Sequence, residues 1–101
     1  MQFYRINANT TSNPNLYQTF RNCTNLKEVY FPNAVTSLYN TFENCHNISR
    51  VSGSSITNMY GTFTNTNVSS TAGLLPNTVL YMNYTFNNCR NLSSVKLPNN
   101  I

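Results

Sequence analysis

The sequence predicts an α/β solenoid, with a short parallel β-sheet on one side and single helical or 3-10 turns and loops on the other. Three observations predict it. A residue pattern recurs about every 22 positions, the apolar residues inside it alternate as they do in a strand, and 101 residues make one small domain. A unit of this length cannot bury its own apolar face, so successive units must stack.

The strand of each unit lies just before a recurring proline or serine. Pro32, Ser54, Pro76 and Pro98 stand 22 residues apart, and each follows a short apolar-alternating segment such as Leu26 to Phe31. A proline at the end of a strand stops further pairing. The return segment, such as Tyr39 to Cys45, is rich in Asn and Thr, which are poor helix formers. We therefore expect at most one helical or 3-10 turn there.

The predicted core consists of two columns of the repeat, Phe20, Phe42, Phe63 and Phe86 with Cys23, Cys45 and Cys89. Thr66 takes the remaining cysteine position, which suggests that this column needs a small buried filler. A disulfide between Cys23 and Cys45 is geometrically conceivable. Reduced cysteines are the expected state, because Cys89 would face Thr66 rather than another thiol.

A third column is made of asparagines, Asn22, Asn44, Asn65 and Asn88. An Asn amide has both a donor and an acceptor, so the column predicts a side-chain ladder that links neighbouring turns. The alternative is that Asn is present because it tolerates left-handed turn conformations. The sequence leaves both interpretations open.

Two regions depart from the regular frame. Residues 1–15 form a predicted half-coil or cap, in which Phe3, Ile6 and Ala8 have the spacing of Leu26, Val29 and Phe31. Residues 16–101 form one domain of about four tandem 22-residue repeats. The third repeat is longer between Val68 and Pro76, which predicts a bulge or altered strand at Gly73 and Leu74.

The residues that could carry catalysis are few. Cys45 and His46 are sequence neighbours, whose side chains usually point apart, and the only carboxylate side chains are those of Glu28 and Glu43. Zinc requires about four ligands, usually in close cysteine or histidine pairs, and three dispersed cysteines with one histidine do not supply them. We expect no catalytic residue, no metal site and no cofactor.

The net charge of +4 arises from scattered Lys and Arg residues and an almost complete lack of acids. Nucleic-acid binding normally needs a dense basic stripe, so a nucleic-acid partner is not expected. No apolar run approaches the length of a membrane span, so membrane insertion is not expected either. The N-terminal residues lack the apolar core of a signal peptide.

The segments "TFRNCTNLKEVYFP", "TFENCHNI" and "ITNMYGTF" resemble BspA-type leucine-rich repeats, which occur in bacterial surface proteins, some parasitic protists and tail or receptor-binding proteins of bacteriophages. The resemblance covers nearly all of the chain from Leu16 onward. Two departures are Tyr39 and Tyr60, where relatives more often have Gly or Ser, and a repeat shorter than usual in the family. The resemblance implies a leucine-rich-repeat solenoid with a binding or adhesive role.

The outward-facing strand positions form the predicted binding face, because stacked repeats present these positions as one continuous surface. It comprises Lys27, Glu28, Tyr30, Arg50, Ser52 and Lys96. A second column, Tyr17, Tyr39 and Tyr60, lies on the return side. These tyrosines would either contact glycans or close the edge of the core with their hydroxyls in water.

These observations predict a non-enzymatic binding or adhesion module of a surface-exposed or phage tail protein. Its expected location is extracellular, on a cell surface or on a virion, and its expected partner is a protein or a carbohydrate on a cell surface. The alternative is a structural spacer repeat in a larger chain. Residues 98–101 match the start of another repeat, so we also expect a longer chain, or a partner or second copy that covers this end.

Overall fold

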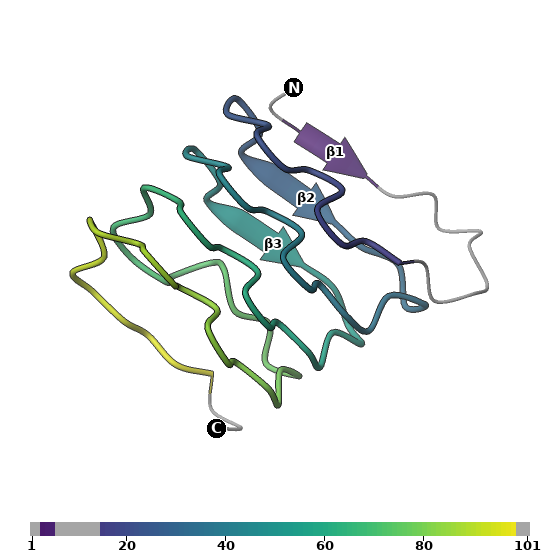
Figure 1. The fold of residues 1–101 in the computed structure, drawn as a ribbon. Helices are drawn as coiled ribbons and strands as arrows, with labels where there is room; N and C mark the ends of the chain where they lie inside the picture. The colour runs from purple at the N-terminus through teal and green to yellow at the C-terminus, as the bar shows by residue number, and fades with distance from the viewer. Residues whose placement is uncertain (1–2, 6–14, 99–101) are drawn as a thin grey trace.

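The chain forms a series of windings that lie side by side in sequence order (Figure 1). The structure is a computed structural model, and it describes the backbone of residues 3–5 and all of residues 15–98. In the orientation of Figure 1 the return segments pass in front of the strands. The predicted stacking of repeat units is therefore the organising feature of the described residues.

One parallel sheet forms on the strand side, as predicted. It contains β1 (Phe3–Arg5), β2 (Glu28–Tyr30) and β3 (Arg50–Ser52), in the order β1-β2-β3. Val29 lies beside Val51 in the register of β2 and β3. Both valines are buried while their neighbours are more exposed, which is the alternation expected of a strand with one face on the core.

The first strand pairs two residues away from the position that its spacing suggests. The spacing of Phe3 and Ile6 placed Phe3 beside Leu26, but Phe3 pairs with Glu28 and Tyr4 with Val29. A strand of three residues carries too short a pattern to specify its own register. Ile6 and Ala8 lie outside the described residues.

The third repeat interrupts the sheet, where the sequence predicts a bulge or altered strand. Gly73 has a φ of 81°, and the Leu74 amide donates to the Thr71 carbonyl oxygen at 3.0 Å to close a turn. Only one backbone bond joins this turn to β3, from the Val51 amide to the Gly73 carbonyl oxygen at 2.9 Å. Within residues 15–98 no strand follows β3, because the turn takes the backbone out of the extended conformation that pairing requires.

The return side consists of turns, and the predicted helical or 3-10 turns are absent from the described part of the chain. The turns close through backbone bonds such as that from the Thr19 amide to the Leu16 carbonyl oxygen, at 3.0 Å. Each winding also bonds to the next: the Phe42 amide donates to the Thr62 carbonyl oxygen at 3.0 Å. Left-handed residues, among them Asn40 and Asn44, end each turn before a second turn of helix can form.

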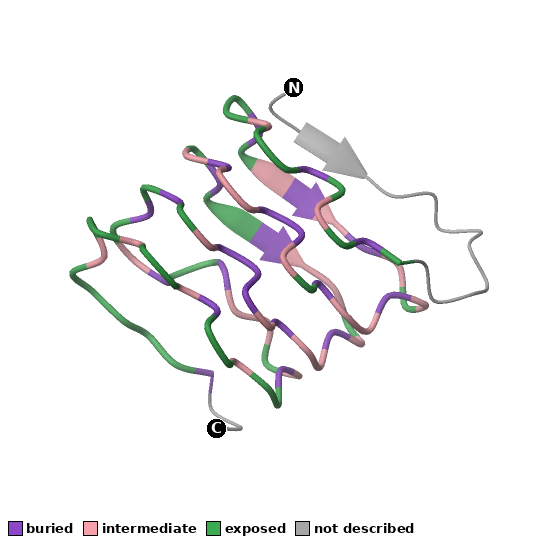
Figure 2. Cartoon of the chain, in the orientation of Figure 1, coloured by how far each residue is buried: buried purple, intermediate pink, exposed green. Residues whose placement is uncertain are grey.

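Within residues 15–98 the core contains a stack of four phenylalanine rings from successive windings. Ring centroids are 5.6 Å apart for Phe20 and Phe42, 5.7 Å for Phe42 and Phe63, and 5.4 Å for Phe63 and Phe86. Phe20, Phe42 and Phe63 are buried, while Phe86 is half-buried because it lies in the last winding. Figure 2 shows that buried residues recur along the windings. Val95 and Leu97 of the last winding are largely exposed.

All three cysteines are free thiols. Cys45 is buried and donates from Sγ to the Phe20 carbonyl oxygen at 2.9 Å, and Cys89 donates in the same way to Phe63 at 3.1 Å. Cys23 and Cys89 are only half-buried and pack against the edge of the core. The cysteine column therefore combines small apolar fillers with weak hydrogen-bond donors.

The role of the asparagine column is mainly to adopt the left-handed backbone conformation at the turns. Asn22, Asn44, Asn65 and Asn88 all have φ between 60° and 64°, the left-handed region that Asn tolerates better than most residues. A side-chain link of the predicted ladder joins one pair within the described residues, from Asn44 Nδ2 to Asn22 Oδ1 at 2.8 Å. Backbone bonds carry the rest of the connection between these turns.

Candidate functional site

The structure brings together only part of the predicted binding face. We call the six residues of this face the strand face: Lys27, Glu28, Tyr30, Arg50, Ser52 and Lys96. The register of β2 and β3 places Glu28 beside Arg50 and Tyr30 beside Ser52. The side chains of these positions flank the buried valines and therefore face outward. Four of the six residues thus lie together on one short stretch of sheet.

An open hollow of about 450 Å³ lies over this stretch; we call it the strand hollow. Glu28, Arg50 and Ser52 line it from the sheet, and Gly73 and Asn77 line it from the third repeat. The hollow exists because the backbone turns at Gly73, so that no fourth strand occupies the position beside β3. A Cβ at residue 73 would lie 2.9 Å from the Ser49 carbonyl oxygen, so glycine is needed for this close approach.

Lys96 and Lys27 lie apart from this hollow. Lys96 lines an adjoining hollow of about 210 Å³, which shares Gly73 and Asn77 with the strand hollow, and Lys96 does not line the strand hollow itself. Lys27 is exposed and precedes β2, and its carbonyl oxygen accepts from the Ser49 and Arg50 amides. The structure therefore brings Glu28, Arg50 and Ser52 together and leaves the two lysines at the margins.

The charged groups of the strand hollow are available to a ligand. Within the described residues the one ion pair joins Arg21 to Glu43, with 3.0 Å between Nε and Oε2. Glu28 and Arg50 are neighbours in the sheet but do not form such a pair. Tyr30 Oη approaches Glu28 Oε2 at 3.4 Å. An exposed guanidinium next to a carboxylate can bind a partner that carries both an acceptor and a donor.

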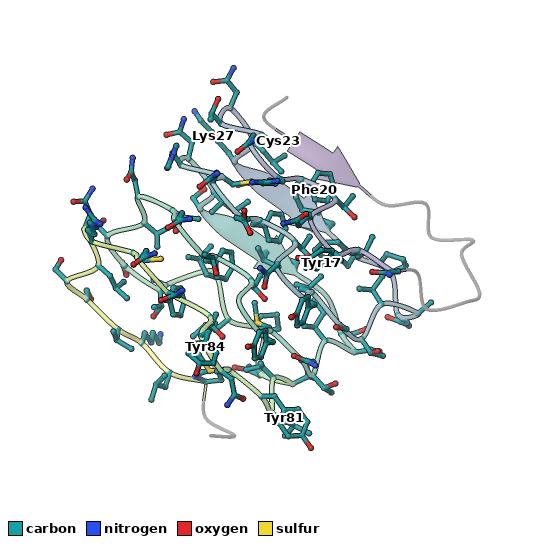
Figure 3. All side chains as sticks on the ribbon, in the orientation of Figure 1. Tyr17, Phe20, Cys23, Lys27, Tyr81 and Tyr84 are labelled. Carbon is teal, nitrogen blue, oxygen red and sulfur yellow. The ribbon has the colours of Figure 1, made fainter. Side chains whose placement is uncertain are left out.

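A second surface is a row of tyrosines on the return side, which we call the tyrosine row: Tyr17, Tyr39, Tyr60 and Tyr84. Figure 3 labels its two ends, Tyr17 and Tyr84. Ring centroids are 5.1 Å apart for Tyr17 and Tyr39, and 4.8 Å for Tyr39 and Tyr60, whose planes differ by only 5°. Tyr17 and Tyr39 are exposed, and Tyr60 is half-buried. The row therefore borders the core and reaches solvent.

Sequence reasoning missed Tyr84, the last member of the row. Asn83 occupies the repeat position of Tyr60, and Tyr84 occupies the position of Gly61. The aromatic residue is shifted by one place, so a column search does not find it. The tyrosine directly before the conserved Thr-Phe step of the repeat, "YTF" in place of "GTF", is the signal that could have revealed it.

Tyr39, Tyr60 and Tyr84 line a hollow of about 380 Å³, which we call the tyrosine hollow. Its remaining lining residues are Asn40, Gly61, Thr64 and Asn87. None of these side chains carries a charge at neutral pH. The tyrosine hollow therefore differs in kind from the strand hollow, which contains a carboxylate and a guanidinium.

Cys45 and His46 do not form a reactive pair in this arrangement. Cys45 is fully buried, and its burial raises the pKa of the thiol from 9.0 to about 12. A nucleophilic cysteine requires a lowered pKa and an accessible sulfur. The thiol instead donates to the Phe20 carbonyl oxygen, which is a structural role.

The sequence matches the BspA type leucine rich repeat region, in six copies over residues 3–101. No curated protein and no solved structure matches the chain. None of the described residues belongs to a helix that is long and apolar enough to cross a membrane. The family implies a solenoid-like repeat fold, in agreement with the stacked windings and the parallel sheet. The match spans almost the whole sequence, and the chain belongs to the BspA-type leucine-rich repeat family.

Proposed function

We propose that this protein is a non-enzymatic binding and adhesion module that recognises a protein or a glycan through the strand face. The observation that carries the proposal is the strand hollow, in which Glu28, Arg50 and Ser52 converge without an ion pair between them. Its volume of about 450 Å³ is within the ordinary range of ligand sites. Arginine and tyrosine, both present on this face, are favoured where partners bind tightly.

The proposal extends to location and assembly. Family members are typically surface-associated, which supports a place on a bacterial surface or on a phage tail. The exposed Val95 and Leu97 of the last winding support contact with a further repeat or with a second copy, because exposed apolar residues next to unpaired backbone favour association. Of residues 98–101, which match the start of another repeat, Pro98 is buried and residues 99–101 lie outside the described residues.

The second candidate function is a structural spacer that holds other modules apart. The regular winding-to-winding backbone bonds favour it, because in a stacked array each repeat is held by its contacts with its neighbours. A spacer has no need for unpaired charges in a hollow. Whether Glu28 and Arg50 take part in binding therefore distinguishes the two functions.

The test uses the full chain on arrays of immobilised peptides and glycans, with the Kd of each bound feature measured afterwards by interferometry. We expect saturable binding that weakens at least tenfold in the Arg50→Ala variant and in the Glu28→Gln variant. Arg90→Ala is the matched control, since Arg90 is exposed but does not line the strand hollow. A chain that binds no array feature, or that binds equally well in all variants, contradicts the proposal and favours the spacer.

A further inference from the structure

We propose that the tyrosine hollow is a binding subsite for a neutral carbohydrate, with the ring of Tyr84 as its stacking platform. This surface lies on the return side, away from the strand hollow. It adds a second site with a named class of ligand, and it stands whether or not the strand face binds a partner.

The ring geometry singles out Tyr84 within the tyrosine row. Tyr39 and Tyr60 stack nearly parallel, so each covers one face of the other. Tyr84 has its centroid 5.4 Å from that of Tyr60 but is turned by 66°. Its faces are therefore not covered by a parallel tyrosine, and the side chain is 65% exposed. The row therefore ends in a largely exposed ring that stacks on no parallel tyrosine.

The local sequence causes this turn of the ring. The repeat positions of Tyr84 are filled by Gln18, Asn40 and Gly61 in the other windings, and all four residues have positive φ, 57° at Tyr84. A bulky side chain in this region is an outlier, and such outliers concentrate at functional sites. The left-handed backbone directs the Tyr84 side chain differently from Tyr17, Tyr39 and Tyr60, which precede the left-handed residue in their windings.

The polar groups around the ring suit hydroxyl-rich ligands. Asn40 is held in place, because Nδ2 donates to Glu43 Oε1 at 3.3 Å and because Gly61 lacks the Cβ that would lie 2.0 Å from Asn40 Oδ1. Thr64 Oγ1 donates to the Gly61 carbonyl oxygen at 2.8 Å, so its lone pairs remain acceptors. Asn87 is exposed, and its backbone N–H donates to the Tyr84 carbonyl oxygen at 3.1 Å, which leaves its side-chain amide to a ligand.

The exposed ring of Tyr84 and its neutral polar neighbours together favour a pyranose over an ion as the ligand. The ring face of tyrosine carries partial negative charge, and the C–H bonds on one face of a pyranose are weakly positive and apolar. The hydroxyls at the edge of the sugar can donate and accept, as can amide and hydroxyl side chains. No charged side chain lines the hollow, so a charged ligand gains nothing from an ion pair there.

Two other aromatic-binding ligands fit less well. Single-stranded nucleic acid needs basic groups for its phosphates next to the stacking ring, and none lines the hollow. Proline-rich peptides dock into grooves between aromatic side chains, but Tyr39 and Tyr60 are in face-to-face contact at 4.8 Å and leave no groove between them. The carbohydrate is the class that requires one open ring and neutral polar neighbours.

The experiment titrates the full chain with cellohexaose, maltohexaose and chitohexaose, observed by ¹⁵N chemical shifts and by isothermal titration calorimetry. We expect saturable binding of at least one of these oligosaccharides, with the largest shifts at Thr64, Tyr84 and Asn87. Tyr84→Asn should weaken that binding at least tenfold. The same variant should fold with an equal or higher Tm, because Asn tolerates the left-handed conformation that Tyr does not.

The matched control is Tyr81→Asn, which removes another exposed tyrosine that does not line the hollow, and it should bind as the unchanged chain does. Arg50→Ala should also leave oligosaccharide binding intact. The proposal for the tyrosine hollow and the proposal for the strand face can therefore be tested independently. The proposal is overturned if none of the three oligosaccharides binds saturably, or if Tyr84→Asn binds as well as the unchanged chain. Binding of a decaproline peptide or of oligo-dT at this hollow in place of the sugars would also overturn it.

Discussion

The Thr62 hydroxyl donates a 2.7 Å hydrogen bond to the carbonyl oxygen of Leu38, one winding earlier in the chain. The same bond recurs from Thr41 to Leu16 at 3.0 Å and from Thr85 to Met59 at 2.7 Å. All three threonines are buried. A side-chain ladder therefore does link the windings from within the core, and threonine forms it more regularly than asparagine does.

Thr62→Val tests this ladder. Valine keeps the shape of the side chain and removes its donor, which leaves the Leu38 carbonyl oxygen with only the longer bond from the Thr41 amide, at 3.3 Å. We expect a loss of about 1–2 kcal/mol in the free energy of unfolding, the usual effect of removing one partner of a buried hydrogen bond. Urea denaturation followed by circular dichroism measures it. Thr24→Val is the control at an exposed position, and an equal loss there would contradict the ladder.

The phenylalanine stack predicts that the loss in the free energy of unfolding on Phe→Ala substitution depends on the position of the ring in the stack. Phe42 has a ring neighbour on both sides and is fully buried, whereas Phe86 ends the stack and is half-buried. Phe42→Ala should lower the free energy of unfolding by about 3–5 kcal/mol, and Phe86→Ala by clearly less, because the end of the stack already meets solvent. Denaturation of both variants under the same conditions compares the two losses. Equal losses would show that the rings do not form one graded stack.

Cys45 predicts a specific dependence of stability on alkaline pH. The pKa of its thiol is 9.0 without burial and about 12 in the folded chain, so the unfolded state ionises first as the pH rises. Its contribution is complete below pH 9 and is lost between pH 9 and pH 12, by about 1.4 kcal/mol per pH unit. Between about pH 9 and about pH 10.5, the unchanged chain should lose about 2 kcal/mol more than Cys45→Thr.

The threonine variant is suitable for this comparison because Thr66 already fills the same repeat position in the third winding. Urea denaturation with a reductant present, at each pH, measures both chains, and the other titrating groups cancel in the difference. If Cys45→Thr loses stability as steeply as the unchanged chain, the thiol is not the buried acid that the structure indicates.

The repeat could be predicted from sequence because each column imposes the same physical requirement in every winding. Phe20, Phe42 and Phe63 recur at nearly constant spacing, and only stacking buries all of them. Family membership and the parallel direction of β2 and β3 follow from that periodicity. The interpretation of Asn44 could not be decided in the same way, because an amide ladder and a left-handed turn place the same residue at the same interval.

Both candidate sites lie where the sequence departs from the regular repeat. The strand hollow exists because Gly73 turns the backbone away from β3, and the open ring of Tyr84 exists because an aromatic residue moved by one position. Neither the size of a hollow nor the angle between two rings is contained in a spacing pattern. The strand face predicted as one surface is divided for the same reason, with Lys96 beyond the turn of the third repeat.

The sequence by itself therefore determined the stacked windings, the phenylalanine core and the family, because burial of periodic apolar side chains is a requirement that the order of residues states directly. Only the tertiary structure decided which polar groups meet. It replaced the expected helical turns by left-handed corners, gave the core ladder to the threonines, and opened two hollows of different character. These outcomes depend on backbone dihedral angles and on contacts between residues more than 20 positions apart, which a single repeat does not specify.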